Sequence, residues 1–139
     1  NECFYALGKV YLEDGHVEEA MNQLVESEDP RSYGLLGTIY EDQNNFVEAY
    51  QHYHKGAREY DALSLYRLGR LYQEGLGVEQ DLSEAIKYYS YAYYLGHQEA
   101  MLALAHMYAL GEGVEVNAKF AHDLYEQYHE SVGNEYENL

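Results

Sequence analysis

The sequence has little of several residue types that carry specific chemistry. Its 139 residues include no tryptophan and one cysteine, Cys3, which excludes an internal disulfide framework and any metal site built from several cysteines. The one proline, Pro30, leaves nearly the whole chain free to be helical. No apolar run approaches the roughly 18 residues that a membrane span needs. We therefore expect a helical protein that does not insert into a membrane.

Basic residues are scarce as well. Lys plus Arg number 8 against 25 Asp plus Glu, which gives a formal net charge of −17. Nonspecific nucleic-acid binding and docking on anionic lipid both need clustered positive charge, so we expect neither. The hydrophobic content of 47% argues against disorder, because disordered chains combine high charge with low hydrophobicity.

What the chain does have is a repeated unit. The pattern Leu-Gly-x-x-Tyr occurs three times, and a fourth copy has alanine for glycine, so the small residues are Gly8, Gly37, Gly69 and Ala105. An alanine follows each at 12 residues in the first two copies and at 16 in the last two, and these are Ala20, Ala49, Ala85 and Ala121. The extra residues contain the glycines Gly75, Gly77, Gly111 and Gly113. A period of about 20–50 residues predicts a stacked array.

Each copy predicts two helices joined by a turn. The first helix carries apolar residues at helical spacing, for example Leu65, Leu68 and Leu71. The expected N-caps of the second helices are His16, Asn45, Asp81 and Asn117, of which histidine is the weakest, and Glu48 and Glu84 would complete capping boxes. Gly96 is expected as the C-terminal glycine of the third copy's second helix.

The recurring small residues predict how the helices pack. Each would lie where the paired helices cross, with the alanine on the facing helix, because overpacking there costs ~1–3 kcal/mol. One pair cannot bury its apolar face alone, so the pairs stack. We predict an all-α, right-handed solenoid of about four antiparallel helix pairs. The expected repeats are about 1–29, 30–58, 61–96 and 97–130, with 131–139 as a disordered or capping C-terminal tail.

The third and fourth copies resemble the Sel1-like repeat. Copy three has the signature residues Leu68, Gly69, Tyr72, Gly75, Gly77, Val78, Asp81, Ala85, Tyr88, Tyr89, Ala92 and Gly96. Copy four departs from the pattern at Ala105, which replaces glycine, and at Asn117, which replaces aspartate. The first two copies lack the glycine loop and look like the shorter tetratricopeptide repeat. The resemblance implies an adaptor or scaffold that binds other proteins and uses no cofactor.

The candidate partner-binding residues lie on the first helix of each pair, which lines the concave face in such a superhelix. They are Tyr5, Lys9, Arg31, Thr38, Tyr66, Arg67, Arg70 and His106, and the wider face includes Glu2, Glu41, Gln73, Leu102 and Ala109. Tyrosine and arginine are favoured as anchors at binding surfaces. Positive charges collected on one face could bind a peptide carboxylate. The alternative is that these bases pair with nearby Glu and Asp.

The 18 tyrosines exceed what the motif needs. The expected core tyrosines are Tyr11, Tyr40, Tyr72, Tyr108, Tyr53, Tyr89 and Tyr125. The others are Tyr5, Tyr33, Tyr50, Tyr60, Tyr66, Tyr88, Tyr91, Tyr93, Tyr94, Tyr128 and Tyr136. The run from Tyr88 to Tyr94 encircles its helix, so part of it faces solvent or a neighbour. These tyrosines serve either partner contact or packing between repeats.

No catalytic, cofactor or metal site is predicted. The two Gly-x-Gly segments lack the strand that a phosphate-binding loop needs, and the histidines do not pair at chelating spacing. We therefore predict a non-catalytic module that binds another protein or peptide on its concave face. The alternatives are an acidic immunity or inhibitor protein that neutralises a basic partner, and a spacer between other domains. Self-association through the terminal repeats also stays open.

The chain begins at Asn1 without an initiator methionine and shows no signal peptide. It is expected to be a processed product or an excised fragment, so its compartment stays open.

Overall fold

The computed structural model describes residues 2–137, and side chains are described for residues 3–133. Within this part the chain forms eight helices and no strand. The helices are α1 (Glu2–Glu13), α2 (Val17–Glu26), α3 (Arg31–Asp42), α4 (Phe46–Arg58), α5 (Ala62–Glu74), α6 (Leu82–Tyr94), α7 (Gln98–Leu110) and α8 (Ala118–Glu137). The predicted all-α solenoid of four helix pairs is confirmed.

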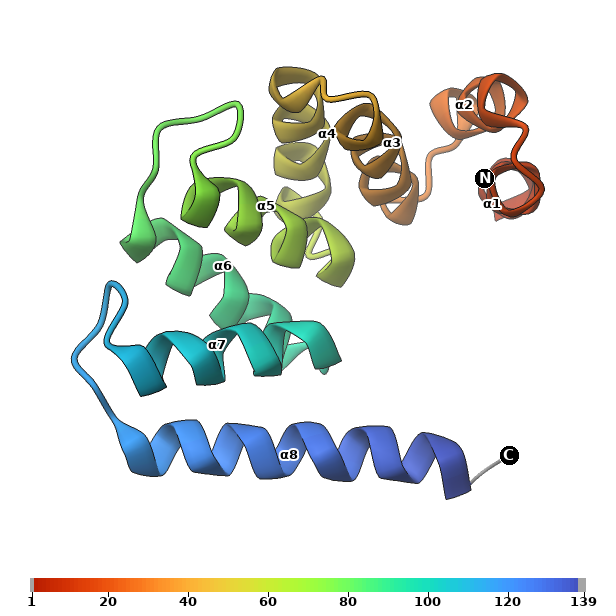
Figure 1. Cartoon of the computed structure of the whole chain (residues 1–139). Helices are drawn as coiled ribbons and strands as arrows, with labels where there is room; N and C mark the ends of the chain where they lie inside the picture. Colours follow the sequence, from red (N-terminus) through yellow and green to blue (C-terminus); the bar gives the residue numbers. More distant parts are fainter. Residues whose placement is uncertain (1, 138–139) are drawn as a thin grey trace.

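The helices follow one another along an open arc. Each odd-numbered helix packs against the next even-numbered helix, and neighbouring pairs pack through α4 with α5 and through α6 with α7. Figure 1 shows α3, α5 and α7 on the inner side of the arc and α4, α6 and α8 on the outer side. We call the inner side the concave face and the outer side the convex face.

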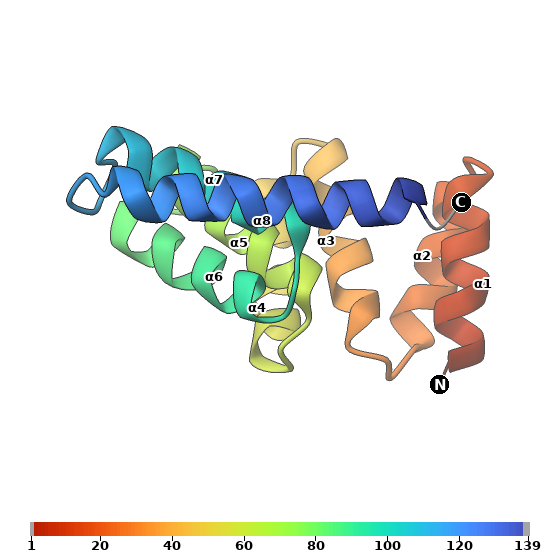
Figure 2. The same cartoon turned by 90° about the horizontal axis from the view of Figure 1, so that it is seen from below.

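The last helix corrects the boundary expected at residue 130. Helix α8 has 20 residues and continues through 131–137, so the described part of the expected tail extends the helix. No proline interrupts this stretch, and Gly133 keeps ordinary helical geometry. In Figure 2, α8 crosses the front of the molecule and extends beyond α7. Residues 138 and 139 lie outside the described residues.

The small residues lie at the helix crossings as predicted. A Cβ added at Gly8 would meet Leu24 Cγ at 2.6 Å, and one added at Gly69 would meet Tyr89 Cδ1 at 2.9 Å. A Cβ at Gly37 would overlap the ring of Tyr53. In the first three pairs, therefore, the side chain that covers the glycine comes four positions after the alanine of the motif. The alanines Ala20, Ala49 and Ala85 are completely buried beside it, and Ala121 is nearly so.

The expected core tyrosines fall into two groups. Tyr53 and Tyr89 are buried, whereas Tyr125 and the four motif tyrosines are half-buried. The half-buried rings pack against buried clusters: Tyr40 and Tyr72 against the one around Leu65 and Leu68, Tyr108 and Tyr125 against the one around Leu104. Tyr66 and Tyr72 pack against both of these clusters and so join the core of the third pair to that of the fourth, whereas the cluster around Leu24, Leu36 and Ile39 is separate.

The helix caps match the sequence in part. Asp81 accepts the backbone N–H of Glu84, and Asn117 accepts that of Phe120, as expected for N-caps. The prediction for Asn45 is wrong, because its side chain makes no cap hydrogen bond. Asn45 has ψ 75°, as does His16, whereas the capping Asp81 is more extended at ψ 101°. The short turns before α2 and α4 therefore leave the cap residue in a backbone conformation that does not aim its side chain at the helix.

The glycine loops join the two helices within the third and fourth pairs, α5 to α6 and α7 to α8. Gly75 and Gly111 cap their helices in the left-handed conformation, at φ 70° and 72°. Gly77 and Gly113 lie against the first residue of the preceding outer helix, where an added Cβ would approach Phe46 O at 2.5 Å or Leu82 Cβ at 2.6 Å. These loops thus pack each glycine-loop pair onto its predecessor.

A substitution pair tests the crossing. We expect Gly37→Ala to lower the free energy of unfolding by about 1–3 kcal/mol, because the completely buried ring of Tyr53 cannot move aside. Gly133→Ala, on an open helix surface, should raise it by up to about 1 kcal/mol through helix propensity. Urea unfolding followed by circular dichroism measures both. Equal effects of the two substitutions would contradict the packing argument.

Candidate functional site

A cavity opens on the concave face between α5 and α7. Its volume is about 360 Å³. Its lining residues are Tyr66, Arg70, Gln73, Glu74, Tyr89, Glu99, Leu102, Ala103 and His106. Three of the predicted partner-binding residues, Tyr66, Arg70 and His106, therefore meet in one hollow although they come from two different repeats.

Helical spacing explains why these residues meet. On α5 the lining residues stand at positions 66, 70, 73 and 74, and on α7 at positions 99, 102, 103 and 106. Both sets follow the spacing of one helix face. Because α5 and α7 are inner helices of adjacent pairs, these two faces border the same hollow on the concave side (Figure 1).

Tyrosines of the outer helices reach the concave face through the crossings. The hydroxyl of Tyr53 donates to Glu41 Oε1 at 2.9 Å, and that of Tyr89 donates to Gln73 Oε1 at 2.6 Å. In the fourth pair the hydroxyl of Tyr125 lies 2.9 Å from His106 Nδ1. In these three pairs the tyrosine of the outer helix thus also forms a hydrogen bond with a polar side chain of the inner helix. In the first pair Leu24 has this position and offers no hydroxyl.

The arginines near the cavity are held by carboxylates. Glu41 Oε2 on α3 lies 3.6 Å from a guanidinium nitrogen of both Arg67 and Arg70 on α5. Arg70 also lies 3.7 Å from Glu74, one turn further along its helix. Partial burial disfavours the charge of Arg70, but the two carboxylates outweigh it and raise its pKa. At Arg67 and Arg70 the structure therefore has the alternative that the sequence left open, in which the basic residues pair with nearby carboxylates.

Tyr66 forms the aromatic wall of the cavity. Its ring centroid lies 4.9 Å from that of His97 and 5.7 Å from that of Tyr89. Burial raises the pKa of Tyr66, and the charge of Glu99 adds to this. Tyr66 is therefore a neutral, half-buried ring held between two others, which suits a rigid contact surface.

The other predicted residues lie away from this cavity. Thr38 donates its hydroxyl hydrogen to Gly34 O at 2.9 Å and accepts from the hydroxyl of Tyr53 at 3.3 Å. Arg31 lies over the ring of Tyr5 at 4.1 Å and pairs with Asp29 at 2.6 Å. Lys9 is exposed on α1. Tyr5 and Arg31 thus form a separate contact between α1 and α3.

Sequence reasoning missed part of the lining. Glu99 and Ala103 were not singled out, and Tyr89 was assigned to the core alone. The signal for Glu99 and Ala103 was present, since they lie three residues before Leu102 and three before His106 on one face of α7. The sequence carried no such signal for Tyr89, because the angle at which α6 crosses α5 decides where its hydroxyl lies.

Within residues 2–137, no group of three or more His, Cys, Asp or Glu is placed to hold a metal ion. None of the described helices is long and apolar enough to span a membrane.

The repeat pattern matches a family model described as Sel1 repeat. The matched ranges are 32–61, 62–97 and 98–127. The first two ranges correspond to the helix pairs α3/α4 and α5/α6, and the third contains α7 and the first half of α8.

Solved structures share the fold. A Sel1 repeat protein from Oxalobacter formigenes is 25% identical with a TM-score of 0.85, and the match covers 91% of this chain and 55% of that one. A protective antigen of uropathogenic Escherichia coli, described as displaying an SLR fold, is 26% identical with a TM-score of 0.79, covering 93% of this chain and 30% of that one.

A curated relative is much longer. The ERAD-associated E3 ubiquitin-protein ligase component HRD3 of Candida glabrata is 36% identical over 55 residues, which are 40% of this chain and 7% of that protein. The chain therefore spans about half of the first solved structure and a small part of the curated relative.

A buried histidine beside the cavity gives a pH-dependent prediction. Burial lowers the pKa of His97 below its usual 6.5, and its Nε2 is buried with no hydrogen-bond partner among the described residues. As the pH falls below 6.5 the unfolded chain binds the proton first, so the folded state loses stability. We expect His97→Asn to make this loss shallower between about pH 7.5 and 5.5, measured by urea unfolding. The same change at exposed His129 is the control, and equal slopes for wild type and His97→Asn would contradict the prediction.

Proposed function

The chain belongs to the Sel1 repeat family, and from this premise we propose that it is a non-catalytic protein-interaction module that binds a partner segment in the concave cavity between α5 and α7. Sel1 repeat proteins commonly act as scaffolds that bind other proteins. The observation that carries the proposal is the convergence of Tyr66, Arg70 and His106 from two repeats on one hollow.

The lining of the cavity suits a peptide side chain. Leu102 and Ala103 supply an apolar floor, and the half-buried ring of Tyr66 supplies a rigid wall. Binding energy at interfaces concentrates in aromatic and arginine anchors that lie in such hollows. A volume of about 360 Å³ has room for one or two side chains, so the partner would enter as an extended segment rather than as a broad surface.

The charges of the cavity favour a neutral or basic segment. Glu74 and Glu99 both line it, whereas its arginine, Arg70, is already paired with Glu41 and Glu74. A partner carboxylate would have to compete with these two carboxylates for one guanidinium and would meet Glu99 as well. An apolar side chain followed by a hydrogen-bond donor or a cation meets no such competition.

The second function raised by the sequence, an acidic immunity or inhibitor protein, gains no support from the similar proteins or from a particular contact. The overall negative charge that suggested it is consistent with any soluble scaffold surface. The concave module is therefore the function that we put to the test.

The double substitution Tyr66→Ala/Arg70→Ala should weaken partner binding about tenfold or more, because it removes the wall and the rim anchor together. Affinity capture from the native source, followed by peptide mapping, identifies the bound segment. Isothermal titration of that synthetic segment then measures the affinity of each variant.

The matched control is Tyr94→Ala/Lys119→Ala, which removes one tyrosine and one cation from exposed positions of α6 and α8. It should bind as the wild type does. Normal binding by a folded Tyr66→Ala/Arg70→Ala chain, checked by circular dichroism, would refute the concave cavity as the site.

A further inference from the structure

A second hollow lies on the opposite, convex side, between the outer helices α4 and α6. Its volume is about 230 Å³, and its lining residues are His54, Ala57, Arg58, Tyr60, Leu65, Lys87, Tyr88 and Tyr91. A neighbouring hollow of about 260 Å³ shares His54 and Arg58 and adds Tyr50, Gln51 and Lys55. The two adjoin along α4 and form one groove, which we call the convex groove.

Cations gather at this groove in a protein that has few of them. Lys55, Arg58 and Lys87 are three of the 8 basic residues in a chain of net charge −17. Among the described side chains, neither Lys55 nor Arg58 has a carboxylate within the 4.0 Å of an ion pair. Lys87 pairs only with Glu84, one turn away on its own exposed helix face, at 3.1 Å. Such a surface pair contributes little and is readily exchanged.

The basic residues of the concave and convex faces differ in whether they form ion pairs. Arg67 and Arg70 share Glu41 across two helices and are half-buried, so their charge is already used within the fold. Lys55 and Arg58 are exposed and their charge is available to a partner. The positive charge that the sequence suggested for peptide carboxylates is thus offered by the convex side.

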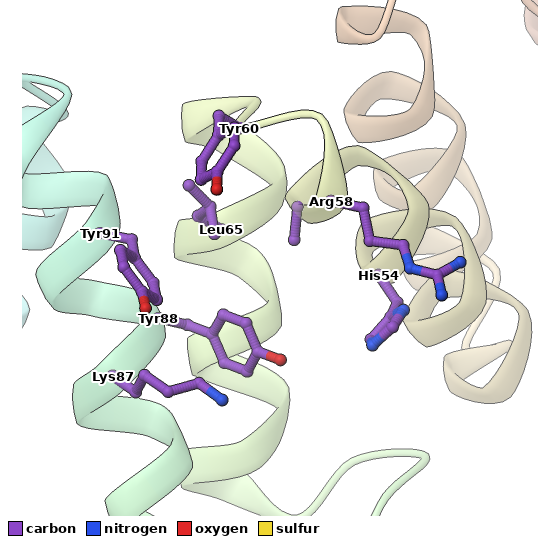
Figure 3. A pocket seen from close by; sticks show the side chains of 8 residues that line it. His54, Arg58, Tyr60, Leu65, Lys87, Tyr88 and Tyr91 are labelled. Atoms are coloured by element: carbon purple, nitrogen blue, oxygen red, sulfur yellow. The ribbon is translucent and has the colours of Figure 1, made fainter.

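Aromatic rings frame the same groove. Figure 3 shows Tyr88 and Lys87 extending from α6 toward α4, where His54 extends into the same gap, while Tyr60 and Tyr91 stand at the end near Leu65. Leu65 and Ala57 are buried and form the floor. Tyr60 is 69% and Tyr91 46% exposed, so two large rings border an apolar floor without being covered. Exposed tyrosines next to a small apolar hollow are typical of contact surfaces.

We propose that the convex groove binds an acidic peptide segment of a partner protein, with one carboxylate against Arg58, a second carboxylate against Lys87, and an apolar side chain over Leu65 between Tyr60 and Tyr91. Two carboxylates are needed because Arg58 and Lys87 end on different sides of the groove (Figure 3). Charge complementarity selects this occupant, because Lys55 and Arg58 have no ion pair among the described side chains and Lys87 has only the surface pair with Glu84. A second copy of this acidic chain would bring that excess against itself and is disfavoured. The groove would let one scaffold hold two segments at once, a neutral or basic one inside the arc and an acidic one outside.

The test uses the whole chain, labelled with ¹⁵N, and two defined peptides. The probe is acetyl-Glu-Leu-Glu-Phe-Glu-amide, and its control is the same peptide with every glutamate replaced by glutamine. Amide chemical shifts followed during titration give the affinity and the site. We expect the glutamate peptide to shift the amides of Arg58, Tyr60, Leu65 and Lys87 and to bind about tenfold or more tightly than its control. Raising the salt from about 50 to 300 mM should weaken it several-fold.

Variants separate this groove from the concave cavity. Arg58→Ala/Lys87→Ala should weaken the glutamate peptide about tenfold or more, whereas Lys9→Ala/Lys119→Ala, with the same change in charge at exposed sites, should not. Tyr66→Ala/Arg70→Ala should leave this binding unchanged. The proposal would be overturned if the two peptides bound equally, or if Arg58→Ala/Lys87→Ala and Lys9→Ala/Lys119→Ala lost the same affinity. Chemical-shift changes centred on Tyr66 and Arg70 would overturn it as well. The concave site is judged on its own partner segment, so the two proposals fail independently.

Discussion

The close approach of two helix backbones within each pair is the constraint on which the rest of the molecule depends. At Gly37 and Gly69 the partner helix places an aromatic ring where any side chain of the inner helix would have been. The ring then passes between the helices, and its hydroxyl ends on the concave face at Glu41 or Gln73. One packing contact therefore sets the spacing of the pair and the position of a polar residue on the concave face.

The charges divide between the two faces for a structural reason. Inner helices of adjacent pairs face one another across the arc, so a carboxylate on α3 can reach arginines on α5, as Glu41 does. The cations Lys55 and Arg58 of α4 and Lys87 of α6 are exposed and line the hollows of the convex side. Leu65 of α5 lies between α4 and α6 there (Figure 3). The concave face consequently offers a mixed, largely neutralised lining, and the convex groove offers unused positive charge. A scaffold with two such faces can distinguish two kinds of partner segment by charge alone.

Much of the fold was predictable because it follows from local spacing. Gly8, Gly37 and Gly69 lie at helix crossings, as the repeat pattern predicted, and Gly75 and Gly111 have left-handed backbone conformations. The cap at Asn45 was not predictable from residue type, since the preceding turn sets a ψ of 75° that no single residue reveals. Of the two expectations for the tail, disorder is wrong for residues 131–137, because α8 continues through them and nothing in their sequence breaks a helix.

The amino-acid pattern predicts the helix pairs, their number and the helix faces on which Tyr66, Arg70 and His106 lie, because helical periodicity is a property of neighbouring residues along the chain. Packing between repeats brings these three side chains to one cavity and places Glu41 beside Arg67 and Arg70. It also leaves Lys55 and Arg58, among the described side chains, without an ion pair on the convex side. Each of those facts depends on how far one repeat is rotated and shifted against the next. That rotation comes from packing between side chains far apart in sequence.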